Sequence, residues 1–223
     1  MKKILVLAVH PDDETLGCGG TLLKYKALGN QIHWIIATEV AVMDGFSKEK
    51  VNERNKEIEL VSKAYDFDSV NRLGIPTMKA DKFDIGIIIN KISTLIKKIK
   101  PEIIFLPFKS DIHSDHKIFF NAAYSCTKSF RFPYVKKVYM METISETDFA
   151  PSTKEDFFVP NTFIDISKFL DKKVEIMKIY KSEVGEHPFP RSEKNIKALA
   201  VNRGAMSNCE YAESFVLLKE IID

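Results

Sequence analysis

Short β-rich runs alternate with helical patterns along most of this chain. Strands are predicted at residues 3–9, 31–38, 69–73, 102–106 and 137–142, with a sixth candidate at 162–166. Apolar residues at helical spacing predict helices at residues 14–28, 48–65, 84–98, 115–129, 167–181 and 193–205. This alternation is typical of a parallel sheet wrapped by helices. We therefore predict an α/β fold with a mostly parallel sheet that is flanked by helices on both faces.

The composition is that of an ordinary globular protein. The 223 residues are 45% apolar and 29% charged, which is enough to build one sizeable core, so we expect a single domain over residues 1–223. The net charge of +2 is too close to zero to indicate a nucleic-acid-binding protein. No apolar run reaches the length of a membrane span, and the first one ends at His10 without a small-residue cleavage site.

The cysteines indicate the compartment in which the chain folds. Cys18, Cys126 and Cys209 form no close pair and have no zinc-type spacing. They fit a reducing environment better than a disulfide framework. We therefore expect a cytoplasmic protein.

Acidic residues crowd the turn after the first predicted strand, which reads His10, Pro11, Asp12, Asp13, Glu14. A turn that only reversed the chain would favour Gly, Asn or Ser, and neighbouring carboxylates repel one another unless a cation or a proton relieves them. A solvated helix start explains the same residues, because Asp and Glu favour the first helical turn. Taken alone, this turn leaves both interpretations open.

The loop after the strand predicted at residues 102–106 carries the second informative motif. It reads Asp-Ile-His-Ser-Asp-His at residues 111–116, so that three of the five histidines of the chain, His10, His113 and His116, follow two strand ends. In a doubly wound sheet the first strand lies beside the fourth, and ligands bind where the strand order reverses there. The sequence therefore predicts that the two loops share one site.

Two imidazoles and one carboxylate, with a position left open for water, form a recognised catalytic zinc shell. His10 and Asp13 are spaced so that a tight turn can aim both inward, and His116 in the first turn of the following helix is the natural third ligand. The same ligands in facial geometry suit ferrous iron. We therefore predict a Zn²⁺ site on these three residues, with Fe²⁺ as the alternative.

Three further residues of these loops have predicted catalytic roles. Asp12, outside the ligand set, is close enough to take a proton from water and later pass it to the leaving group. His113 would face the substrate carbonyl and stabilise the developing oxyanion as a donor. Asp115 is the expected partner that fixes the tautomer or the charge of a histidine.

The two motifs together resemble those of the LmbE-like or PIG-L family of zinc-dependent de-N-acetylases. The matching segments are residues 8–14 with the glycine-rich run at 17–20, and then residues 113–116. The resemblance implies a Rossmann-like fold and hydrolysis of an N-acetyl group from an amino sugar, as in family enzymes that act on N-acetylglucosaminyl-phosphatidylinositol and on the glucosamine intermediates of mycothiol and bacillithiol.

Carried over position by position, the resemblance assigns the same roles as the analysis of the two loops. It implies metal ligands at His10, Asp13 and His116, a general base at Asp12, and oxyanion stabilisation by His113 supported by Asp115.

Weaker family segments extend the resemblance over most of the chain. They include Arg54 with Glu57, and residues 202–204 and 211–215 near the end. The resemblance is patchy at residues 67–100 and 145–161, and we expect these regions to choose the substrate. The second of them is polar and contains prolines, so it is a candidate loop or lid.

Two residues are candidates for substrate contact. Arg54 is one, because the family has an arginine near this place in its substrate pocket; the alternative is a surface helix arginine paired with Glu57. Glu39, at the end of the second predicted strand, either borders the substrate pocket or caps its loop.

A nucleotide-cofactor domain is the first rival, because glycines follow a strand and Glu39 lies about twenty residues further on. This pattern fails, since Leu22 occupies the position of the third glycine and charged residues fill the place of a pyrophosphate. Gly17, Gly19 and Gly20 more plausibly let the first helix pack closely against the sheet.

The expected function is therefore metal-dependent removal of acetyl from an N-acetylated amino sugar on a lipid, a nucleotide or another small carrier. The alternatives are a metal-dependent esterase or phosphoesterase and a non-catalytic metal-binding relative, although the latter gains nothing from Asp12. The expected partner is this small-molecule substrate and not nucleic acid. A homo-oligomer, the aglycone, the physiological metal and the choice between acetyl and formyl stay open.

Overall fold

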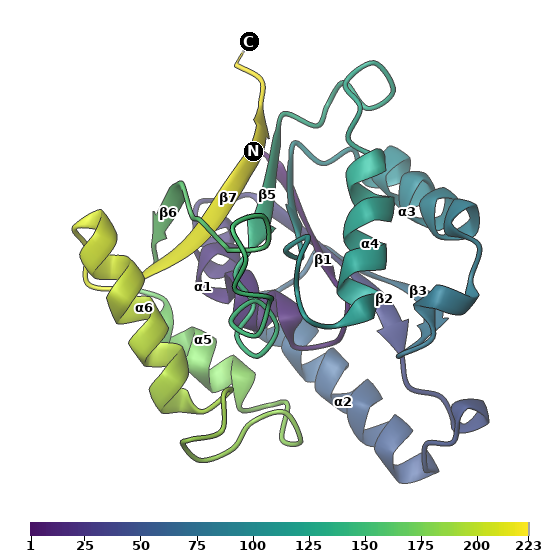
Figure 1. Ribbon diagram of the computed structural model, residues 1–223, viewed down its shortest axis with the longest axis horizontal. Helices are drawn as coiled ribbons and strands as arrows, with labels where there is room; N and C mark the ends of the chain where they lie inside the picture. Colours follow the sequence, from purple (N-terminus) through teal and green to yellow (C-terminus); the bar gives the residue numbers. More distant parts are fainter. Residues whose placement is uncertain (223) are drawn as a thin grey trace.

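The computed structural model describes residues 1–222, which form one seven-stranded sheet with helices on both faces (Figure 1). The strands are β1 (Lys3–Ala8), β2 (Gln31–Glu39), β3 (Ser69–Pro76), β4 (Ile103–Leu106), β5 (Lys137–Met141), β6 (Thr162–Asp165) and β7 (Ala212–Glu220). The helices are α1 (Asp13–Ala27), α2 (Lys48–Tyr65), α3 (Ile85–Ile99), α4 (Ser114–Ser125), α5 (Leu170–Met177) and α6 (Glu193–Ser207), with 3₁₀ turns η1 (Val42–Asp44) and η2 (Ala80–Lys82).

The strand order is β3-β2-β1-β4-β5-β7-β6. The first five strands in this order are parallel, whereas β7 runs antiparallel to both β5 and β6. Val6 of β1 lies between Trp34 of β2 and Phe105 of β4. The predicted neighbourhood of the first and fourth strands is therefore confirmed, and the loops after β1 and β4 leave the same edge of the sheet.

The two faces of the sheet bury alternate residues of each strand, as a doubly covered parallel sheet requires. On β1, Ile4 and Val6 pack into one apolar cluster with α1, α2, α5 and α6, and Leu5 and Leu7 pack into another with α3 and α4. Figure 1 shows the same division, with α3 and α4 on the side of the sheet opposite to α1 and α2. The predicted layer arrangement is confirmed.

The predicted elements are also confirmed, with ends that differ by at most four residues. Residues 145–161 contain no helix or strand, as expected of a loop. The strand β7 was missed, because an apolar run such as Phe215-Val216-Leu217-Leu218 does not by itself distinguish a helix from a strand. It becomes a strand because it pairs with β5 on one side and β6 on the other.

The glycines after the acidic turn bring α1 close to the sheet, as predicted. A Cβ atom on Gly17 would lie 2.9 Å from the Cβ of Met141 in β5. Such an approach excludes any larger residue. These glycines therefore serve packing, and the nucleotide-cofactor interpretation gains no support from them.

Helix α1 is kinked at Cys18, where φ is −149°. Directly after the kink, the carboxylate of Glu213 in β7 accepts from the backbone N–H groups of Gly20 (2.9 Å) and Thr21 (2.7 Å). Lys173 of α5 donates to this carboxylate at 2.7 Å and to the carbonyl of Leu16 at 2.9 Å. This buried ion pair holds the first turn of α1, and with it the acidic turn, in place.

No helix within residues 1–222 combines the length and the apolar character that crossing a membrane would need.

Candidate metal centre and active site

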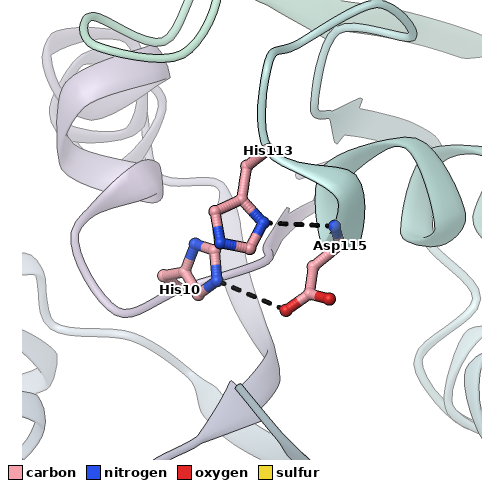
Figure 2. Close-up of side chains that lie close together, drawn as sticks. All are labelled: His10, His113 and Asp115. Atoms are coloured by element: carbon pink, nitrogen blue, oxygen red, sulfur yellow. Dashed lines mark hydrogen bonds and ion pairs between the residues drawn. The ribbon is translucent and has the colours of Figure 1, made fainter. Parts of the chain in front are cut away.

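The loops after β1 and β4 meet beyond the ends of these two strands. The ring centroid of His10 lies 4.6 Å from that of His113 and 5.3 Å from that of His116. Figure 2 shows His10 and His113 side by side, close to the start of α4. Residues about a hundred positions apart in sequence are therefore brought together because β1 and β4 are neighbours.

Three potential ligand atoms face one another at this point. His116 Nε2 lies 3.4 Å from His10 Nδ1 and 3.3 Å from Asp13 Oδ2, and the third separation, from His10 Nδ1 to Asp13 Oδ2, is 3.9 Å. Four ligands placed tetrahedrally about 2.0–2.1 Å from a zinc ion are about 3.4 Å apart. The triangle of His10, Asp13 and His116 therefore fits a tetrahedral metal ion that keeps one position open.

His116 is oriented by a residue to which the sequence analysis assigned no role. Its Nδ1 lies 2.8 Å from Oδ2 of Asp111, and the other carboxylate oxygen of Asp111 accepts from Thr147 Oγ1 at 2.6 Å. Both His116 and Asp111 are fully buried. Because Nδ1–H donates to Asp111, the lone pair of Nε2 points toward the triangle. The only sequence feature that could have indicated this role is that Asp111 is an acidic residue in the same loop as His116.

The electrostatics of the triangle favour a positive charge at its centre. Burial by itself raises the pKa of Asp13, but His116 and His10 outweigh it and hold that pKa well below its usual range. Burial lowers the pKa of His116, but Asp13 and Asp111 outweigh it and raise that pKa well above the ordinary value. The same carboxylates would attract a divalent cation at the centre of the triangle.

Asp12 precedes Asp13 of the triangle and lines the cavity. It is the N-cap residue of α1, yet its side chain makes no capping hydrogen bond. Burial, followed by the charges of Asp13 and Glu183, raises the pKa of the Asp12 carboxyl well above its ordinary value, against the pull of Arg191. A buried carboxyl with a raised pKa holds a proton more readily than a free one, which suits a group that accepts and returns a proton.

Asp115 is placed differently from the expectation in one respect. Its backbone N–H donates to Nδ1 of His113 at 3.1 Å, and its carboxylate Oδ2 lies 3.7 Å from Nε2 of His10 (Figure 2). The carboxylate also accepts from the backbone N–H groups of Met78 (2.8 Å) and Ala80 (3.3 Å). The histidine that this carboxylate faces is therefore His10.

The surroundings of His113 favour the neutral form of its ring. Burial, followed by the nearby His10, lowers its pKa. Since Nδ1 accepts from the backbone of Asp115, the proton of the neutral ring lies on Nε2. His10, His113 and Asp115 also form a second group whose atoms are close enough to hold a cation.

A cavity of about 290 Å³ opens in front of these residues. His10, Asp12, Asp13 and His113 line it on the side of the triangle, and Glu39 at the end of β2 also borders it. Glu39 thus borders this cavity, and its contact with substrate stays a prediction.

Arg54 lines the same cavity but is 8% exposed, so it is not a surface residue. Its Nη1 donates to the carbonyl of Pro11 at 3.0 Å, and its Nη2 pairs with Glu183. The predicted pairing with Glu57 is present, with 3.5 Å between Nε and Oε2. Arg54 therefore links α2 to the acidic turn as well as bordering the cavity.

The segment between α5 and α6 contributes residues that the sequence analysis missed. Glu183 binds both Arg54 and Arg191, and Nη1 of Arg191 lies 4.0 Å from Asp12 Oδ2. Glu146, from the loop after β5, also lines the cavity. No local motif marks these residues, because only the folded chain brings the C-terminal segments to the edge of β1.

Solved structures confirm the fold. The conserved protein TT1542 from Thermus thermophilus aligns with a TM-score of 0.79 and 26% identity, covering 100% of this chain and 97% of that one. GalB, the 4-carboxy-2-hydroxymuconate hydratase of Pseudomonas putida, aligns with a TM-score of 0.77 and 18% identity, covering 100% and 98%. The second likeness shows the fold alone, and a hydratase on this fold means that the chemistry must be argued from the site.

Sequence comparisons identify the family. Diacetylchitobiose deacetylase from Thermococcus kodakarensis is 25% identical over 229 residues, which cover 96% of this chain and 82% of the relative. The family model described as PIG-L, GlcNAc-PI de-N-acetylase, matches residues 5–127, more than half of the chain and both loops of the site. The chain belongs to the PIG-L family.

Proposed function

We propose that this protein is a metal-dependent hydrolase that removes the N-acetyl group from an N-acetylated amino sugar. The family and the deacetylase relative support this assignment. The observation that carries it is the triangle of His10, Asp13 and His116 with the buried carboxyl of Asp12 beside it in one cavity. We propose Zn²⁺ as the metal, with Fe²⁺ as the alternative, because two imidazoles and a carboxylate suit both ions.

His10, Asp13 and His116 would hold the metal, which supplies Lewis-acid chemistry that makes water more acidic and polarises an amide carbonyl. Asp12 would take the proton of the attacking water. Its raised pKa lets it keep that proton until the amine leaves and then return it to the amine nitrogen. Acetate and the free amino sugar are the products.

His113 would stabilise the amide oxygen as negative charge develops on it. Its Nε2–H is the available donor, because Nδ1 is occupied by the backbone N–H of Asp115. Asp115 thus positions His113 through its backbone and faces His10 through its carboxylate. A donor aimed at an oxyanion in a cavity sheltered from water typically contributes about a hundredfold or more in rate.

Arg54 and Glu39 are the proposed substrate contacts. Both border the cavity, and the side chain of Glu39 at its edge has no hydrogen bond or ion pair within the described part of the chain. A carboxylate so placed is suited to accept from sugar hydroxyls. The substrate itself would be an amino sugar carried on a lipid, a nucleotide or another small carrier.

We further propose that residues 1–223 act as one domain in the cytoplasm. One sheet runs through the described residues, and the three cysteines are free, which suits a reducing compartment. The proposed partner is the small-molecule substrate.

The decisive experiment measures acetate released by the purified protein from a panel of N-acetylhexosaminides, with chelator, with added Zn²⁺ and with added Fe²⁺. Phosphate and alcohol release are measured in parallel on phosphorylated and O-acetylated sugars. We expect acetate from N-acetyl substrates only, abolished by the chelator and restored by metal. Phosphate release without acetate release would replace the proposal with a phosphoesterase.

A further inference from the structure

The backbone of Asp12 is unusual among the described residues. Its φ is 140° and its ψ is −27°, whereas the other non-glycine residues with positive φ have values between 55° and 73°. Those values belong to the ordinary left-handed region, but 140° does not. A residue holds such a conformation only when the surrounding structure enforces it.

Glu14 is the residue that reaches back to this point. Its Oε2 accepts from the backbone N–H of Asp12 at 3.1 Å. Glu14 thus pairs the buried N–H of Asp12. The Asp12 carboxyl makes no capping bond, and Asp12 lines the cavity. In a helix start of ordinary design the N-cap side chain itself binds the first helical N–H groups.

The Glu14 carboxyl is itself held rigidly. Its second oxygen accepts from Thr15 Oγ1 at 2.7 Å and from the hydroxyl of Tyr180 at 2.9 Å. The hydroxyl of Tyr65 in turn donates to Thr15 Oγ1 at 3.1 Å. Three parts of the chain, α1, α2 and the segment after α5, therefore converge on one carboxyl behind the acidic turn.

Glu14 does not touch the cavity, since its side chain is fully buried and absent from the cavity lining. Nor does it have a cationic partner within 4 Å among residues 1–222. Burying a carboxyl without a cation is costly, and an apolar residue would pack there at lower cost. A role in stability alone therefore explains its presence poorly.

We infer that Glu14 is the positioning residue of the proposed base: it holds the strained backbone of Asp12 and thereby aims the Asp12 carboxyl at the reacting water. This inference rests on the proposed function of Asp12. Glu14 acts through Asp12 and takes no part in proton transfer. A misplacement of about 1 Å in such a group can cost about a hundredfold in rate.

The test compares Glu14→Leu with Glu14→Gln. Leucine removes the acceptor for the Asp12 N–H, whereas glutamine keeps one. In Glu14→Leu we expect kcat to fall about tenfold to a hundredfold, with KM and bound zinc within about twofold of wild type. Glu14→Gln should recover most of the loss. A purely structural role would instead lower the melting temperature without changing kcat per folded, metal-loaded molecule.

Hydrogen exchange gives a readout that needs no turnover. The Asp12 amide should exchange at least about tenfold faster in Glu14→Leu, and at close to the wild-type rate in Glu14→Gln, because only the first variant removes its acceptor. Unchanged protection of this amide in Glu14→Leu would overturn the inference. If Glu14→Leu does not fold, Tyr180→Phe replaces it, because this variant removes one of the two donors that hold Glu14. It must then show a smaller fall in kcat and a smaller increase in the exchange rate of the Asp12 amide.

A double-mutant cycle separates this inference from the proposed function. If Glu14 acts through Asp12, Glu14→Leu has no further effect on kcat in an Asp12→Ala background. An additional loss equal to that in the wild type would refute it. Wild-type turnover of Asp12→Ala alone would refute the proposed base instead, whereas an inactive Asp12→Ala with full activity in Glu14→Leu would remove only the positioning role.

Discussion

The two loops that build the site are held in opposite ways. In the loop at residues 10–14 the backbone is strained at Asp12, and buried side chains clamp it through Glu14 and Arg54. In the loop at residues 111–116 the backbone is relaxed, with no non-glycine residue at positive φ. The backbone N–H of Asp115 orients the His113 ring, and the Asp111 carboxylate orients the His116 ring.

This difference follows from what each loop must supply. The tight turn presents the proposed ligand Asp13 and the proposed proton acceptor Asp12 on successive residues, and the unusual φ of Asp12 costs about 1–3 kcal/mol of strain. The other loop presents His113 and His116 three residues apart, one helical turn, so that both can project the same way from a regular helix start.

The largest expected effect comes from Asp12→Ala, which removes the proposed base. We expect kcat to fall by about a hundredfold to ten-thousandfold, while bound zinc, measured by atomic emission, stays at the wild-type stoichiometry because the three ligands are untouched. Loss of zinc together with activity would mean that Asp12 belongs to the ligand set.

Asp12→Gly is the matched variant. It should be as inactive as Asp12→Ala but more stable by about 1–2 kcal/mol, since glycine accepts a φ of 140° more readily than alanine. Chemical denaturation of both metal-free variants checks this expectation. Equal stability would show that the conformation at this position carries no strain.

His113→Ala should have the second largest effect, because it removes the proposed hydrogen-bond donor to the oxyanion. It also removes a helix cap, since the His113 ring accepts from the N–H of Asp115 at the start of α4. We expect kcat to fall about a hundredfold and stability to fall by about 1 kcal/mol. His113→Asn keeps a capping side chain but cannot reach the cavity, so it should lose activity alone. Equal destabilisation in both variants would contradict the capping role.

The sequence predicted that the two loops meet, but it did not predict every strand of the sheet. Hydrophobic periodicity placed β1 and β4, and the handedness of crossovers made them neighbours, so the meeting of His10 with His113 and His116 was accessible. The strand β7, which the sequence analysis missed, shows the limit of prediction from periodicity. Its apolar run has no periodicity of its own, and it forms a strand only by pairing with two neighbouring strands.

What could not be predicted depends on side chains that converge from distant segments. Arg191 and Glu183 reach the edge of β1 only through the packing of α5 and α6, and no spacing in the sequence expresses that contact. The strain at Asp12 is equally invisible, since Asp is a common residue in turns and at helix starts. Glu14 could be read only as one more acid of the first helical turn.

The third prediction concerns how the relaxed loop orients His116, its proposed metal ligand. Asp111→Asn replaces the acceptor of the His116 Nδ1–H by an amide, which weakens the bond that orients the ring. We expect zinc affinity to fall about tenfold to a hundredfold, measured by competition with a chromogenic chelator, while kcat at saturating zinc changes much less. Unchanged affinity would mean that packing alone orients His116.

The smallest effect on the proposed metal site should come from Thr147→Val, one step further from the metal. Thr147 donates to Asp111 at 2.6 Å and accepts from the N–H of Thr143 at 2.9 Å, so valine leaves two buried polar groups without this partner. We expect the free energy of unfolding to fall by about 1–3 kcal/mol and zinc affinity to fall less than in Asp111→Asn, while Thr147→Ser retains both. If Thr147→Val weakened zinc binding as much as Asp111→Asn, the relaxed loop would depend on its buried hydrogen bonds as strictly as the strained loop depends on Glu14.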